Sequence, residues 1–211
     1  MEGNVLKTCR VATGVCILIL GGCASSGIQR TERTVDSAQT LRNEYENFGA
    51  QIDITVRTLD RITTTHADDL KPAFKNFTTE LTELESQAKR VISRSKNLNS
   101  HSSQYLRTWE RQLTKVDTPA LRQQAEQRRD QAAAMLEDTK DELERIQPEY
   151  EQFIAGLNEI KLVLDYDLNP GGVASITNVI AKAKNEAIPL KNDIDTVIRG
   201  LDAIIETLSG F

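Results

Sequence analysis

The chain has 211 residues, with 26 basic and 31 acidic side chains and a net charge of −5. This acidic balance argues against nucleic acid as a partner, because binding to phosphates relies on an excess of Lys and Arg. Aromatic residues make up 5% of the chain, helix-favouring residues dominate, and no strand-like alternation is visible. We therefore expect an all-α protein.

Residues 1–22 have the layout of a secretory signal peptide. Two basic residues, Lys7 and Arg10, precede an apolar run over residues 11–20, which is the expected order of charged and apolar regions. The run is about half of the roughly 20 residues that a helix needs to span a bilayer. We expect residues 1–22 to be removed.

The residues that end this run are similar to the bacterial lipobox: Leu20, Gly21, Gly22, Cys23 and Ala24. The resemblance implies cleavage before Cys23, a diacylglycerol on its thiol and an acyl group such as palmitate on its new amine. Residues 23–30 would then be the lipidated end and a tether. An ordinary signal peptide with an incidental cysteine is the alternative.

The residue after the cysteine bears on location. Ala24 is not the Asp that resembles an inner-membrane retention signal, so we expect the periplasmic face of the outer membrane if the source has two membranes. Cys9 and Cys16 would leave with the signal peptide and Cys23 would carry lipid, which leaves no cysteine for a disulfide or a metal site. The mature chain would remain acidic, because the signal peptide removes more basic than acidic residues.

Four segments carry apolar residues at alternating spacings of three and four, the pattern of helices that pack side by side with a left-handed supercoil. We expect helices at about residues 31–65, 69–116, 119–166 and 172–209, forming one domain over residues 31–211. The longest of these apolar seams consists of Leu70, Phe74, Phe77, Leu81, Leu84, Ala88, Val91, Ser95, Leu98, Ser102, Tyr105 and Trp109.

The breaks between the helices are short. Asp117 or Thr118 followed by Pro119 predicts a capped helix start, and so short a connection makes the second and third helices an antiparallel hairpin. Pro148 should bend the third helix or cost a hydrogen bond. The expected fold is an elongated up-down four-helix bundle.

Helix lengths predict that one end of the hairpin projects from this bundle. The second and third helices would each be about 70 Å long at 1.5 Å per residue, whereas the first and last would cover about 50 Å. The projecting antiparallel coiled coil has a poorer seam, with Ser95, Ser102, Arg128 and Thr139. Its tip is a candidate contact for the membrane or for a protein partner, through Tyr105, Leu106, Trp109, Leu113 and Leu121. Alternatively, Tyr105 and Trp109 cap the hairpin's own small core.

Other candidate sites are weaker. His66 and His101 have no second histidine at ligand spacing, so both are expected at the surface, and no metal or cofactor is predicted. Asp165, Asp167 and Asn169 resemble the opening of a calcium loop, but Pro170 stands where that loop needs Gly and Ile176 where it needs an acid. No catalytic motif is present, and we expect a protein that is not an enzyme.

Four segments of the chain, residues 32–38, 105–109, 168–169 and 174–176, carry a resemblance to a known family. Through them the chain resembles uncharacterised bacterial lipoproteins of the long helical-hairpin type, a domain of unknown function. The family implies no catalytic residues.

The expected function is that of a lipid-anchored spacer, scaffold or adaptor in the cell envelope, with the membrane and an envelope protein as partners. The alternative is a helical-bundle carrier of a small apolar or lipid ligand, and an enzyme is a third and weaker hypothesis. Long apolar seams are also compatible with a homo-oligomer.

Overall fold

The computed structural model describes residues 24–209. Four long helices, α1 (Ala24–Thr64), α2 (Leu70–Leu113), α3 (Pro119–Tyr166) and α4 (Pro170–Ser209), make up nearly all of this range, and a short 3-10 turn, η1 (Ala67–Asp69), precedes α2. No strand occurs among these residues, so the all-α prediction is confirmed. The predicted signal peptide and Cys23 lie outside the described residues.

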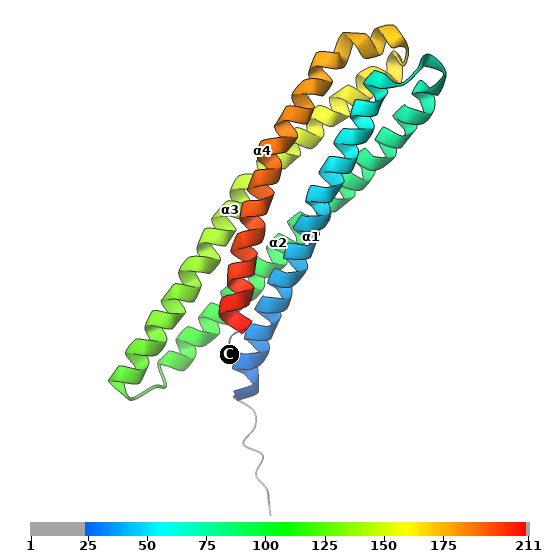
Figure 1. Ribbon diagram of the computed structural model, residues 1–211. Helices are drawn as coiled ribbons and strands as arrows, with labels where there is room; N and C mark the ends of the chain where they lie inside the picture. The colour runs from blue at the N-terminus through cyan, green and yellow to red at the C-terminus, as the bar shows by residue number, and fades with distance from the viewer. Residues whose placement is uncertain (1–23, 210–211) are drawn as a thin grey trace, which may run out of the picture.

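The helices lie side by side in an up-down bundle (Figure 1). Helix α1 packs against α2 and α4, and α3 packs against the same two helices, so α2 and α4 occupy opposite corners. We call the end with the α1–α2 and α3–α4 connections the base. The opposite end, with the α2–α3 loop, is the tip, and α1 begins and α4 ends on that side (Figure 1).

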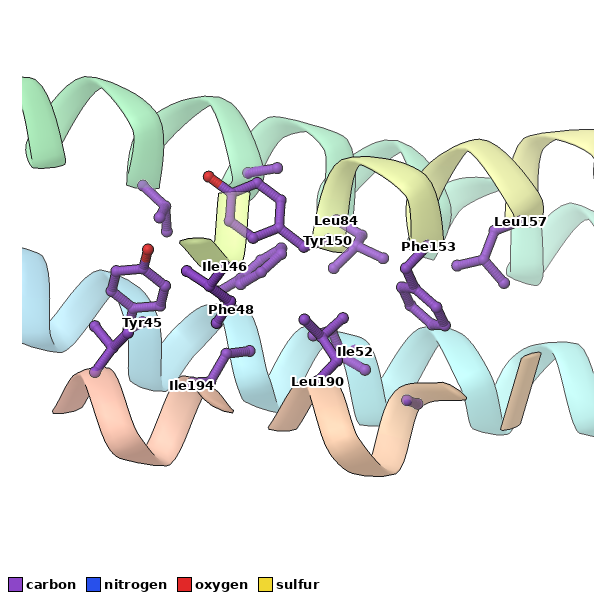
Figure 2. Close-up of a cluster of buried hydrophobic side chains, with 14 of the residues drawn as sticks. Tyr45, Phe48, Ile52, Leu84, Ile146, Tyr150, Phe153, Leu157, Leu190 and Ile194 are labelled. Carbon is purple, nitrogen blue, oxygen red and sulfur yellow. The ribbon is translucent and has the colours of Figure 1, made fainter. Parts of the chain in front are cut away.

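The apolar seams form the core, as the spacing predicts. In the central layer Tyr45 and Phe48 of α1 meet Ile146 and Tyr150 of α3 and Ile194 of α4, and all five are almost fully buried (Figure 2). The rings of Phe48 and Tyr150 pack edge to face with centroids 5.2 Å apart. Each such side chain contributes roughly 1.5–3 kcal/mol when it leaves water, so the seams supply the main stabilisation.

Ion pairs between α1 and α4 follow one register along the bundle. Lys184 binds Asp60 at 2.7 Å, Lys191 binds Asp53 at 2.6 Å, and Arg42 binds Asp202 at 2.5 Å. Partly exposed pairs of this kind each contribute about 0–1 kcal/mol. They therefore favour this alignment of the two helices more than they add to overall stability.

The start of α1 differs from the sequence-based prediction. The helix begins at Ala24 and not near residue 31, so residues expected as a tether form its first turns. The reason is tertiary: these turns pack along the hairpin, where Arg30 reaches Gln104 at 3.5 Å. The hairpin does pass the end of α4, but α1 accompanies it (Figure 1). The tip is thus a three-helix structure and not a two-helix stalk.

The third helix has the predicted bounds, 119–166. Pro148 lies inside it on the exposed face. Near its start Leu121 is exposed, whereas Leu136 and Thr139 further along are buried. The apolar face therefore shifts around the helix before it enters the four-helix part.

The α3–α4 turn is a compact helix cap and not a calcium loop. The side-chain oxygen of Asn169 accepts the backbone N–H groups of Gly171 at 2.9 Å and Gly172 at 3.0 Å. This starts α4 at Pro170, two residues earlier than predicted. A Cβ at position 172 would collide with the backbone oxygen of Asp167, so the turn requires glycine there.

Replacing this glycine should destabilise the bundle. We expect Gly172→Ala to lower the free energy of unfolding by about 1–3 kcal/mol, because the backbone of the turn must shift to admit a methyl group. Gly156→Ala is the matched control: a Cβ there has open space within 4 Å, and helix propensity favours alanine by up to about 1 kcal/mol. Urea unfolding followed by circular dichroism measures both, and equal effects would contradict this account of the turn.

Two buried tyrosines should make the fold sensitive to alkali. Burial raises the pKa of Tyr45, with a smaller contribution from neighbouring Tyr150, and burial likewise raises the pKa of Tyr150. Above about pH 10 the unfolded chain loses protons that the folded chain keeps. The free energy of unfolding should then fall by about 1.4 kcal/mol per pH unit for each tyrosine. Urea titrations at rising pH measure this slope, and Tyr45→Phe should reduce it. An unchanged slope in Tyr45→Phe would contradict the assignment of the effect to Tyr45.

Candidate functional site: the hairpin tip

The loop at the tip connects α2 and α3 through residues 114–118. Thr118 has an extended backbone before Pro119, as the sequence predicts, but its side chain forms no capping hydrogen bond. Arg122 instead donates from Nε and Nη2 to the backbone oxygen of Val116, at 2.9 and 2.5 Å. The first turn of α3 thereby holds the loop closed.

The structure separates the five predicted tip residues into two groups. Tyr105 and Leu113 are buried, at 7% and 8% exposure, and Leu106 and Trp109 are half-buried against the core. Leu121 is the exposed member, at 58%. The rings of Tyr105 and Trp109 pack together with centroids 5.5 Å apart. These two aromatic residues therefore contribute to the tip's own packing, and Leu121 is the most exposed of the five.

Burial also affects the chemistry of Tyr105. It raises the pKa of the hydroxyl, and this effect is partly offset by a hydrogen bond with Thr31 and by the positive charge of Arg128. The hydroxyl thus remains protonated at neutral pH.

A pocket opens beside this aromatic pair, with a volume of about 360 Å³. We call it the tip pocket. It lies between three helices and is mainly apolar, with lining residues Gly27, Arg30, Thr31, Tyr105, Thr108, Trp109, Gln112, Ala125 and Arg128. Its volume falls within the range of small-molecule sites, about 300–1,000 Å³.

The tip pocket exists because two conditions coincide. Helix α4 stops before the tip (Figure 1), so no helix of residues 24–209 occupies the fourth corner of the bundle there. Small side chains at Gly27 and Ala125 then leave space beside Trp109. The sequence does not reveal the α1 side of the pocket, because residues 23–30 carry no apolar seam that would predict a helix there.

The two histidines have different surroundings. His66 is exposed at the base, as predicted, whereas His101 is half-buried and its Nδ1 lies 2.5 Å from the hydroxyl of Ser37 on α1. His101 therefore lies at the surface but is only partly exposed. Its role in the structure is to join α2 to α1 near the tip. Among residues 24–209 no three His, Cys, Asp or Glu side chains converge as metal ligands would.

A second exposed apolar group, which the sequence analysis did not single out, lies at the base. Tyr166 at the end of α3 is 87% exposed, with Leu162 at 57% and Val163 at 45% one turn earlier. None of the helices between residues 24 and 209 contains an apolar stretch long enough to cross a membrane.

Comparison with known proteins yields one assignment. Neither the curated proteins nor the solved structures gave a match. One family model, described as "Protein of unknown function (DUF2959)", matches residues 21–208. That match spans all four helices and the tip, which shows that the chain belongs to the DUF2959 family.

Proposed function

We propose that this protein is a non-enzymatic lipoprotein of the bacterial envelope, anchored through Cys23 at the periplasmic face of the outer membrane, and that its rod is a scaffold or adaptor for another envelope protein. The observation that carries the proposal is the place where α1 begins. Helix α1 starts at Ala24, directly after the lipobox cysteine, and Gly27 already lines the tip pocket. An anchor at Cys23 would therefore hold the tip at the membrane.

The core of the rod supports a structural role. Its central layers are filled by side chains from the facing helices, and the largest of these are fully buried. Helices of 44 and 48 residues give a body about 65–70 Å long. Such a body can present binding surfaces far from its anchor, and the exposed group at Leu162, Val163 and Tyr166 is a candidate for one of them.

An experiment in cells tests anchor and adaptor together. A photoreactive residue replaces Leu121 at the tip or Tyr166 at the base, each with and without Cys23→Ser. With Cys23 intact, the protein should fractionate with membranes and one position should crosslink to a discrete envelope protein. Cys23→Ser should deplete the mature, membrane-bound form, because two or three acyl chains supply the anchoring.

Two results would contradict the proposal. If Cys23→Ser is processed and fractionates as the unchanged protein does, the lipid anchor is contradicted. If no discrete protein is crosslinked at either position while the anchor is intact, the adaptor role is contradicted.

A second function, binding of an apolar or lipid ligand, is favoured by the tip pocket. The site lies at the tip and not between all four helices, and its wall includes Trp109, the single tryptophan of the chain. A saturated acyl chain is long, narrow and apolar, which suits a mainly apolar pocket of about 360 Å³.

Tryptophan fluorescence provides a direct test. A nitroxide-labelled fatty acid should quench Trp109 in a saturable manner if it enters the tip pocket. Ala125→Phe, which fills the pocket, should weaken this quenching at least about ten-fold, the effect of losing roughly 1.4 kcal/mol of binding. Ala134→Phe, at an exposed position of the same helix, is the control. Equal quenching in the two variants would exclude the pocket as the binding site.

A further inference from the structure

The outward face of α2 carries a straight row of positive side chains, which we call the basic stripe: Lys71, Lys75, Lys89, Lys96, Arg107 and Arg111. Lys71, Lys89 and Arg107 follow one another at intervals of about five full helical turns, so they point in the same direction. Leu98, midway between Lys89 and Arg107, points the opposite way and is 2% exposed. The stripe is therefore on the side of α2 that faces away from the core.

All six side chains of the basic stripe are exposed, and none forms an ion pair within residues 24–209. Arg111 donates to the hydroxyl of Thr108, a neutral partner. The positions between them on this face are mostly Ser and Thr, such as Thr78, Ser93 and Ser100. The stripe thus runs for about 60 Å as a cationic, hydroxyl-rich surface.

The acidic residues of α2 are held elsewhere. Glu83 binds Arg90 at 2.8 Å, and Glu110 lies 3.6 Å from Arg129 of α3. Glu80 accepts Gln51 at 2.8 Å and Glu85 accepts Asn158 at 2.7 Å. None of the six cations of the basic stripe takes part in these four interactions, and basic residues outnumber acidic residues on α2 by eight to four.

The charge of the neighbouring helix has the opposite sign. Helix α2 has eight basic and four acidic residues, whereas α3 has six basic and eleven acidic residues. Next to an anionic surface, α2 would be attracted and α3 repelled. This difference in charge favours contact of the α2 side of the rod with an anionic surface.

We propose that the basic stripe lies on the anionic lipid surface of the membrane that carries the anchor, so that the rod reclines with α2 against the headgroups. The inference rests on the proposed lipid anchor. Charges act over about 10 Å at 0.1 M salt, so an upright rod would bring only its tip within range. A reclining rod brings the whole stripe into range, and each cation near an anionic membrane strengthens association roughly five-fold.

The shape of the stripe favours lipid over a protein partner. A membrane is flat and uniformly charged, so it can meet six cations spread along about 60 Å of a straight helix. The competing occupant is the acidic face of α3 on a second copy of this chain, which is of similar length.

The test uses the full mature, lipidated protein reconstituted in vesicles. A fluorophore is attached to Ser100→Cys within the stripe or to Ala181→Cys on α4, at the opposite corner of the bundle; both positions are exposed. A nitroxide on the lipid headgroup reports proximity. With phosphatidylglycerol present, the Ser100 label should be quenched and the Ala181 label should not. Quenching at Ser100 should disappear in pure phosphatidylcholine or in about 1 M salt, where screening falls to about 3 Å.

Matched charge variants locate the effect. Changing Lys71, Lys89, Lys96 and Arg107 to Gln should abolish quenching at Ser100 through a loss of at least about a hundred-fold in surface association. Changing Arg57, Arg61, Lys182 and Arg199 to Gln removes the same charge from exposed positions of α1 and α4 and should leave quenching intact. Circular dichroism of both variants checks that each remains helical.

The outcomes separate the inference from the function on which it rests. Protein that does not float with the vesicles would overturn the anchor and this orientation together. Protein that floats but shows no dependence on phosphatidylglycerol would overturn the orientation alone. A third outcome is quenching between labelled copies that requires the basic stripe, with no proximity of the label to headgroups. That result would assign the stripe to contact with a second copy and overturn the lipid assignment.

Discussion

The burial of one apolar seam on each of four long helices is the constraint on which the rest of this structure depends. None of the helices could bury its seam alone, so each packs against two neighbours, and the core extends along the rod. Packing of this kind leaves little freedom for a conventional internal cavity where all four helices are present. Features open to ligands or partners are therefore confined to the outward faces and to the end where one helix is missing.

The sequence was sufficient to predict the helices that bury a seam. The three-four spacing predicted the class of fold, the start and end of α3 and most buried residues, because core packing determines those positions directly. It predicted the beginning of α1 poorly. Residues 24–30 have no apolar seam of their own, and they meet the hairpin through contacts such as Arg30 with Gln104, which join residues 74 positions apart.

The tip shows why the candidate site was only partly predictable. Composition identified the aromatic pair, but whether Trp109 faces a partner or its own core depends on where α1 and α4 end. With α1 present, Tyr105 is covered, at 7% exposure. With α4 absent, a space remains beside Trp109. The apolar spacing within one helix does not indicate where α1 begins or α4 ends relative to the hairpin. The tip pocket therefore could not be predicted from that spacing.

The distribution of charge between α2 and α3 has a different cause from that of the core. Opposite charges on adjacent helices could stabilise the hairpin by direct pairing, and Arg129 with Glu110 is such a pair, at 3.6 Å. Much of the remaining pairing, however, is directed elsewhere: Arg90 binds Glu44 of α1, and Arg145 binds Asp193 of α4. The cations of the basic stripe lie on the outward face of α2, where pairing with α3 is geometrically excluded. Because internal stability does not require that row, its order along the length of α2 is better understood as a property of the surface that α2 presents to its surroundings.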